Sequence, residues 1–299
     1  MWPPTEGKTM AAQTALTPLP VFAPTREASE LARIALALRK QVVHMVARTG
    51  QGYVQQGLGA ADLFATLYFS ELNLKPEDPA WPQRDRFILS TAHNTAIFYA
   101  TLAARGILDA RRLDTYCDDG SELEINASER LGPMIEATCG SLGQGLSVGV
   151  GMAAALKRSG SNSRVYVVLG DGELQEGQVW EAALVAGNWG LDNLCLIIDA
   201  NAMQVEGHIN QVQPDEPLAD KWRAFRWHTH DIDGNSIPAL LKTLQLARTV
   251  PGQPHCIIAR TLVGKGAPSL EGILGHNLKL PPQAAALALQ ELDHLEIQA

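Results

Sequence analysis

The chain has 299 residues and a formal net charge of −8, with 32 acidic and 24 basic side chains. A hydrophobic fraction of 46% supports a large core, and the acidic balance disfavours nucleic acid or an anionic membrane as the main partner. No apolar run is long enough to span a bilayer, and no pair among the four cysteines has CxxC spacing. We therefore expect a cytoplasmic protein with free thiols and either one large α/β domain or two small ones.

The predicted elements begin after a segment rich in Pro, Thr and Ala, so residues 1–26 are expected to form a flexible tail and residues 27–299 the folded domain. Apolar spacing predicts a helix over Glu27–Arg48, and a turn at Gly59-Ala60 is expected to start a second helix, Ala60–Leu72. The later elements, in chain order, are strand Arg86–Ser90, helix Asn94–Arg105, a long loop over 110–137 with a short helix, a small-residue helix from the glycines at 140–145 to Arg158, strand Arg164–Leu169, helix Gly177–Gly190, strand Leu194–Asp199, strand Trp227–Ile232, helix Ile237–Arg248 after a cap at 233–236, strand His255–Arg260 and a last helix after Pro281-Pro282. This alternation predicts an α/β fold with a parallel sheet flanked by helices on both faces.

Oxygen-bearing residues follow two of the predicted strands. One strand runs into Gly170-Asp171-Gly172, and the next delivers Asn201 and Met203. Because open α/β sheets bind ligands at the carboxyl ends of their strands, these residues are expected to meet there. A carboxylate, an amide oxygen and the Met203 main-chain carbonyl suit a hard divalent cation, and the glycines let backbone amides approach an anion.

The string GDGELQEGQVWEA at 170–182, together with Asn201, resembles the thiamine-diphosphate fingerprint of the amino-terminal part of transketolase. A lone Gly-Asp-Gly is more often a hairpin turn, but here strand, turn, helix, strand and asparagine occur in the family's order. The resemblance implies that Asp171, Asn201 and the Met203 carbonyl hold Mg²⁺ or Ca²⁺ against the two phosphates of thiamine diphosphate. Gly170 and Gly172 would then line the cofactor as well.

Further positions resemble family cofactor contacts. The segment Gly140–Gly145, with Gly140 and Leu142, resembles the stretch that meets the thiazolium and diphosphate, although glycine-rich helix starts often serve packing alone. His93 resembles a histidine against the diphosphate, and its alternative is an ordinary polar residue after a strand.

Two residues carry implied catalytic roles. His276 resembles a histidine near both diphosphate and substrate. Glu176 resembles a glutamate at the subunit boundary that couples two active sites, and its alternative is a carboxylate interacting with a helix start.

Two family histidines that contact the sugar are replaced. Gly52-Tyr53-Val54 stands where transketolase has Gly-His-Pro, and Asn126 occupies the position of the second histidine. An amide can hydrogen-bond but cannot titrate near neutral pH. We therefore expect a donor or acceptor other than the usual pentose-phosphate sugars.

The resemblance covers roughly residues 25–299, and the chain ends where full-length transketolase continues into the domain that binds the aminopyrimidine and supplies the catalytic glutamate. Fewer than a hundred residues follow Met203, too few for a second domain of typical size. We expect a split enzyme that transfers a two-carbon ketol or related acyl unit, active only with a C-terminal transketolase-like subunit in an α2β2 heterotetramer. The alternatives are the alpha subunit of a 2-oxo-acid dehydrogenase and a non-catalytic cofactor-binding scaffold.

Overall fold

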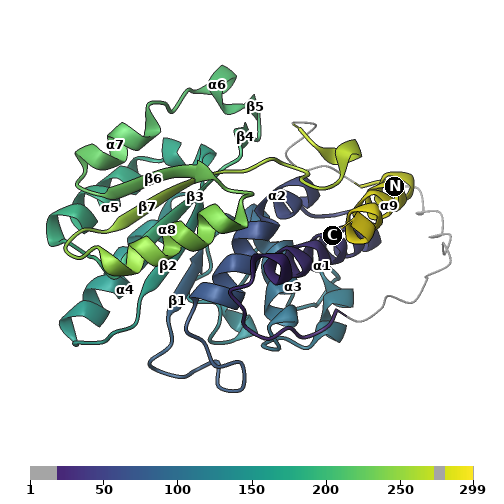
Figure 1. Cartoon of the computed structure of the whole chain (residues 1–299), viewed down its shortest axis with the longest axis horizontal. Helices are drawn as coiled ribbons and strands as arrows, with labels where there is room; N and C mark the ends of the chain where they lie inside the picture. Colours follow the sequence, from purple (N-terminus) through teal and green to yellow (C-terminus); the bar gives the residue numbers. More distant parts are fainter. Residues whose placement is uncertain (1–18, 273–279, 299) are drawn as a thin grey trace, which may run out of the picture.

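The computed structural model describes residues 19–272 and 280–298. Its centre is a five-stranded sheet in the order β1-β2-β3-β7-β6, in which every neighbouring pair is parallel (Figure 1). The strands are β1 (Arg86–Leu89), β2 (Val165–Gly170), β3 (Leu194–Ala200), β6 (His228–Asp233) and β7 (His255–Arg260). Each agrees within one residue at either end with its sequence prediction, which confirms the parallel α/β fold.

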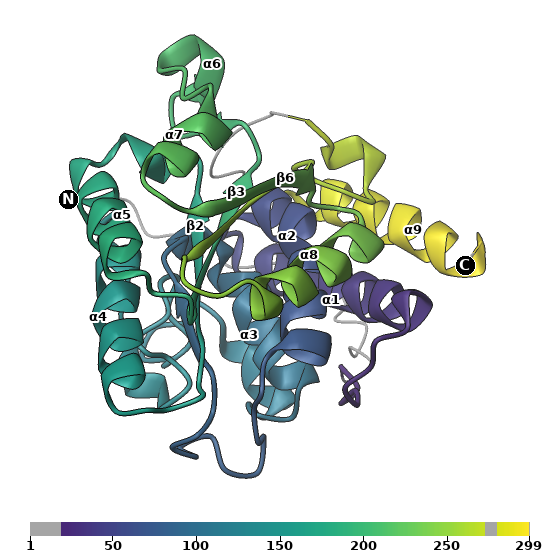
Figure 2. The same cartoon turned by 60° about the vertical axis from the view of Figure 1, so that its left-hand side comes forward.

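Helices cover both faces of the sheet, as Figure 2 shows in a view nearly along it. On one face lie α4 (Gln144–Arg158), α5 (Gly177–Trp189) and α7 (Leu218–Ala224). On the other lie α1 (Ala28–Thr49), α2 (Val54–Thr66), α3 (Thr95–Ala104), α8 (Ile237–Thr249) and, against α1, α9 (Pro282–Gln298). Because strand side chains alternate, Tyr166 and Val168 enter the core on the side of α1, α2, α3 and α8. Val165 and Val167 enter the core on the side of α4, α5 and α7.

The remaining elements are short and join the larger ones. They are η1 (Leu67–Glu71), η2 (Ala92–Asn94), η3 (Ala110–Thr115), η4 (Glu129–Leu131), η5 (Gly172–Gln175), β4 (Met203–Gln204), β5 (Gly207–His208), α6 (Ile209–Val212) and η6 (Pro268–Leu270). The predicted loop over 110–137 thus contains two short helical turns, η3 and η4. At α8 the expected cap is confirmed, since the Ser236 side chain accepts a hydrogen bond from the Ala239 amide.

The predicted start of the second helix is wrong. α2 begins at Val54, and Gly59 lies inside it rather than in a turn. A Cβ at Gly59 would lie 2.8 Å from the carbonyl oxygen of Leu262, so the glycine allows the helix to approach the chain that follows β7. The sequence shows the missing side chain but not the neighbour that requires it to be missing.

The expected flexible tail is also wrong for its described part, residues 19–26. Phe22 is buried, its amide donates to the carbonyl of Ala104, and its ring packs edge-on against Phe69. The Thr25 amide donates to the carbonyl of Phe69. This segment therefore packs onto the folded domain, and the rest of the predicted tail lies outside the described residues.

Two expectations from composition agree with the structure. All four cysteines are free. No described helix combines the length and apolar character needed to cross a bilayer.

Candidate functional site

Asp171 lies where the chain leaves β2. Its buried carboxylate accepts hydrogen bonds from the backbone amides of Gly172, at 2.9 Å, and Ala202, at 2.6 Å. Ala202 follows β3, so this side chain joins the carboxyl ends of two neighbouring parallel strands. Burial raises the pKa of Asp171 to about 7, and the nearby Asp199 carboxylate contributes to the rise.

The glycines beside Asp171 provide space rather than an unusual backbone conformation. Neither Gly170 nor Gly172 has positive φ. A Cβ at Gly170 would lie 3.3 Å from Cε1 of His93, and one at Gly172 would lie 3.2 Å from Cβ of Gln204. The space at both glycines is thus bordered by other parts of this chain, and the approach of an anion to their amides stays a prediction.

Asn201 is held at the end of β3 by its own loop. Its side-chain oxygen accepts a hydrogen bond of 2.9 Å from the amide of Met203, and its side chain hydrogen-bonds to Asp199. Asp199 is buried and also accepts hydrogen bonds from the side chains of Asn94, at 3.0 Å, and Thr261, at 2.5 Å. The structure therefore brings Asp171, Asn201 and Met203 together as predicted and adds a buried network that orients Asn201.

The charge of this cluster fits a cation. Burial raises the pKa values of both Asp171 and Asp199, and no lysine or arginine in the described part of the chain pairs with either carboxylate. A buried carboxylate without a positive partner is costly, and a divalent ion would supply that partner. Each Asp171 carboxylate oxygen, and the Asn201 amide oxygen, accepts a hydrogen bond from a backbone amide and retains a further lone pair for a metal.

Glu173 is a buried residue that the sequence analysis missed. Its Oε1 accepts hydrogen bonds from the Ser90 hydroxyl and from the Gly143 amide, and its Oε2 accepts one of 3.2 Å from the Gly170 amide. One side chain thus ties together the end of β1, the glycine-rich segment before α4, and the end of β2. Its place two residues after Asp171 in the fingerprint was a signal for it, but Ser90 and Gly143 are distant in sequence.

His93 lies in η2 and its ring stands edge-on to Tyr53, with centroids 6.1 Å apart. It also faces Gly170, which places it beside the Asp171 turn. Tyr53, the replacement for a family histidine, is therefore at the same site as the predicted cofactor residues.

The glycine-rich segment also reaches this edge of the sheet. Gly143 has positive φ, and a Cβ there would lie 2.9 Å from Cβ of Glu176. The side chain of Gln178 donates to the carbonyl of Leu142, whose own side chain is 46% exposed. A Cβ at Gly140 would lie 3.3 Å from the amide nitrogen of Asn126, so the second replaced position adjoins the predicted cofactor segment.

The structure describes only one of the two predicted catalytic residues, and the roles of both stay predictions. Glu176 precedes α5, its side chain makes no capping hydrogen bond, and it is exposed. His276 lies outside the described residues, and its implied role stays a prediction.

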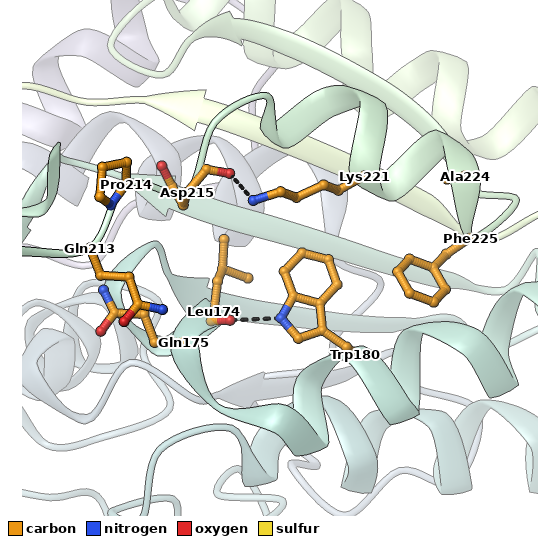
Figure 3. A pocket seen from close by; sticks show the side chains of 9 residues that line it. All are labelled: Leu174, Gln175, Trp180, Gln213, Pro214, Asp215, Lys221, Ala224 and Phe225. Carbon is orange, nitrogen blue, oxygen red and sulfur yellow. Dashed lines mark hydrogen bonds between the residues drawn. The ribbon is translucent and has the colours of Figure 1, made fainter.

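A cavity of about 460 Å³ lies beside the site rather than in it (Figure 3). Leu174, Gln175 and Trp180 line one side, and the Trp180 indole donates to the Leu174 carbonyl. On the opposite side Lys221 donates to the Asp215 carbonyl. None of the predicted cofactor residues lines this cavity, so the site is built from strand ends and loops instead.

The parallel sheet and its polar strand ends define an α/β domain that binds a ligand at the carboxyl edge of the sheet. The family model described as transketolase, thiamine diphosphate binding domain, matches residues 31–280. The chain therefore belongs to the transketolase family. It is a thiamine-diphosphate-dependent transferase chain of the transketolase type. These matches favour transketolase over the 2-oxo-acid dehydrogenase alternative.

Curated relatives match almost end to end. The 6-deoxy-6-sulfo-D-fructose transketolase subunit SqwG of Clostridium sp. (strain MSTE9) is 39% identical over 265 residues, which cover 88% of this chain and 96% of that protein. An apulose-4-phosphate transketolase subunit of Actinobacillus succinogenes is 38% identical, also over 88% of this chain and 96% of its own.

Solved transketolases share the fold over a longer chain. That of Campylobacter jejuni superposes with a TM-score of 0.78 at 27% identity, covering 90% of this chain and 48% of that one. The Pichia stipitis enzyme in complex with sedoheptulose 7-phosphate gives 0.79 at 26% identity, covering 91% and 45%. The present chain spans about half the length of these solved proteins.

Proposed function

We propose that this chain is the diphosphate-binding subunit of a two-subunit transketolase-like enzyme, assembled as an α2β2 heterotetramer. The partner is a C-terminal transketolase-like subunit that supplies the pyrimidine-binding domain and the catalytic glutamate. Support comes from two relatives that are named as subunits and are covered over 96% of their length. The solved transketolases, in contrast, are covered over less than half.

The observation that carries this proposal is the buried Asp171 beside Asn201 at the carboxyl ends of β2 and β3. Asp171, Asn201 and the Met203 carbonyl would hold Mg²⁺ or Ca²⁺, which binds the diphosphate. When bound, thiamine diphosphate supplies the carbon nucleophile for the carbon–carbon chemistry. The chain's own contribution is to grip and orient the diphosphate end of that cofactor and to exclude water from it.

The other predicted residues surround this proposed metal and diphosphate site. His93 and the Gly170 and Gly172 turn would lie against the diphosphate, and Gly140 and Leu142 would lie toward the thiazolium. The exposed Glu176 would meet the equivalent region of a second copy and couple the two sites. His276 would contact diphosphate and substrate.

The proposed substrate is a ketose derivative outside the usual pentose phosphates. Tyr53 contacts His93 and Asn126 adjoins Gly140, so both replaced positions border the proposed cofactor site. Neither position carries an imidazole, the side chain that exchanges protons near neutral pH. The two named relatives are transketolase subunits for a sulfonated sugar and for apulose 4-phosphate, which supports an unusual sugar here too.

Replacing Asp171 tests the proposed metal-dependent binding of the cofactor. We expect Asp171→Ala to abolish Mg²⁺-dependent binding of thiamine diphosphate, measured by titration calorimetry. Asp119→Ala, at an exposed carboxylate in a loop, is the matched control and should bind like the original chain. Unchanged affinity in Asp171→Ala would contradict the assignment.

The partner and the substrate are tested by turnover. The pure chain with thiamine diphosphate and Mg²⁺ should show essentially no activity, and co-purification with the product of the neighbouring coding region should restore it. A donor screen then compares ketose phosphates, sulfonated ketoses, hydroxypyruvate and pyruvate. Turnover by the pure chain would refute the two-subunit proposal. Ordinary rates with standard ketose phosphates would refute the unusual substrate.

A further inference from the structure

Three histidines meet at the end of the sheet opposite to Asp171. His228 begins the edge strand β6 and pairs in register with His255, which begins β7; His230 follows two positions along β6. Because all strands are parallel, this amino-terminal end lies roughly 16 Å from the carboxyl edge, the length of a six-residue strand. The cluster is therefore separate from the proposed cofactor site.

Side-chain alternation along β6 and β7 places the three histidines on the face of the sheet that α8 covers. His255 shares its face of β7 with Ile257 and Ala259, which pack in the core beneath α8. Ring centroids are 4.7 Å apart for His228 and His230, and 5.2 Å apart for His228 and His255. One ring nitrogen from each histidine lies within 4.8 Å of the other two.

The hydrogen bond of His255 sets its tautomer. Its Nε2 lies 3.1 Å from the carbonyl oxygen of Val250 and therefore carries the proton that it donates there. Its Nδ1 then presents a lone pair. This pattern, with one ring nitrogen bonded to a backbone carbonyl and the other left as an acceptor, is the usual arrangement of a metal-binding histidine.

That lone pair has no partner within the described chain. The Nδ1 of His255 and the Nε2 of His230 are both buried and make no hydrogen bond to any described residue. His255 is 0% exposed, so bulk solvent does not reach its ring. Leaving buried polar atoms unpaired is costly, and a ligand bound by these nitrogens would remove that cost.

Burial also favours the neutral, metal-binding form of two of these rings. Burial lowers the pKa of His255 to about 4, and burial together with His228 lowers the pKa of His230. Both shifts favour the neutral imidazole. Neutral imidazole nitrogen suits zinc and related transition metals and not Mg²⁺, which prefers oxygen.

We propose that His228, His230 and His255 bind one zinc-type divalent metal ion that fastens the edge strand β6 to β7. Three imidazoles leave a fourth tetrahedral position for water. Zinc–nitrogen distances of about 2.0–2.1 Å put tetrahedral ligand nitrogens about 3.3–3.4 Å apart, so ring nitrogens that lie within 4.8 Å of one another must close by up to about 1.5 Å when the ion binds. The ion cross-links the outermost strand, which is bonded to the sheet along one edge only.

The test uses the full chain with any histidine tag removed, titrated with Zn²⁺ and with Co²⁺. We expect one equivalent to bind, a Co²⁺ visible spectrum of tetrahedral type, and a rise in the melting temperature with Zn²⁺. His228→Asn and His230→Asn, at the two partly exposed positions, should each weaken binding by at least about tenfold, since loss of a mere supporting contact costs 10–100-fold. His294→Asn, at an exposed histidine on α9, is the matched control.

Circular dichroism confirms that each variant is folded, and Co²⁺ displacement by Zn²⁺ on the original chain provides a readout that needs no variant. The proposal is overturned if the original chain binds no stoichiometric Zn²⁺, or if both β6 variants bind as tightly as His294→Asn. Binding of Mg²⁺ and thiamine diphosphate should be the same in all three variants. The proposed cofactor site and the proposed histidine site are therefore tested independently.

Discussion

At the scale of single residues, Asp171 shows how burial prepares a carboxylate for a cation. Two backbone amides hold it in place, yet burial still raises its pKa to about 7. Without metal, the folded chain therefore favours protonated Asp171 up to about pH 7. In the unfolded chain this carboxyl ionises near its ordinary pKa of about 3.9, so the free energy of unfolding falls as the pH rises from about 3.9 towards 7. A bound cation would reverse this preference.

We accordingly predict that protons compete with the metal. Mg²⁺-dependent affinity for thiamine diphosphate should fall about tenfold per pH unit below about pH 7, because one proton must leave for the ion to bind, and should level off above it. Calorimetry in buffers of different ionisation enthalpy measures both the affinity and the proton released. An affinity that is constant between about pH 5.5 and 8 would contradict the role of Asp171.

Glu173 makes a second residue-scale prediction. Glu173→Gln keeps the shape but replaces one acceptor oxygen with a donor that faces another donor, the Gly143 or Gly170 amide or the Ser90 hydroxyl. We expect a loss of about 1–3 kcal/mol in unfolding free energy and weaker cofactor binding, measured by denaturation and titration. Glu181→Gln, on the exposed side of α5, should change neither, and equal stability of the two variants would refute the anchoring role.

At the scale of elements, two helix glycines look alike in sequence but differ in surroundings. A Cβ at Gly187 of α5 would lie 1.9 Å from the carbonyl oxygen of Phe225, whereas one at Gly151 of α4 would have nothing within 4 Å. α5 can therefore lie against the end of α7 only if position 187 has no side chain. Gly151 carries only the entropic cost of a glycine in a helix.

Alanine at these positions should thus have opposite effects on unfolding free energy. Gly187→Ala should destabilise the chain by about 2 kcal/mol or more, because backbone must move. Gly151→Ala should stabilise it by about 0.5–1 kcal/mol, the ordinary helix preference for alanine. Chemical denaturation of both variants measures the difference, and the same sign for both would contradict the packing described.

At the scale of the whole molecule, the sheet separates two hydrophobic cores, and neighbouring strands place a cysteine in each. Cys195 of β3 belongs to the core under α1, α2 and α8, and Cys256 of β7 to the core under α4, α5 and α7. Both are 0% exposed, and burial raises the pKa of Cys195 to about 12. Cys117, in contrast, is partly exposed.

Thiol labelling should therefore report on global unfolding. At about pH 8 we expect Cys117 to react with an alkylating reagent in the native protein, and Cys195 and Cys256 to react only at the rate at which the whole domain opens. Peptide mass spectrometry with and without denaturant measures this. Rapid native labelling of either strand cysteine would mean that the sheet opens locally.

Much of the fold is predictable because it depends on local patterns. Apolar periodicity locates all five strands of the main sheet to within one residue, and the strand order along the chain indicates that Asp171 and Asn201 meet. The predictions fail where a distant neighbour decides the outcome. Nothing near Gly59 in sequence shows that Leu262 packs against it, and nothing in residues 19–26 shows that Phe69 and Ala104 hold them.

The sequence by itself determined the class of fold and the family, since the residues that grip a diphosphate follow buried strands in a recognisable order. Only the tertiary structure decided that Glu173 joins three segments, that Tyr53 stands against His93, and that His228 and His255 share one cluster. The physical reason is strand register. Hydrogen bonding between parallel strands places the first residue of β6 beside the first residue of β7, and no spacing within either strand contains that information.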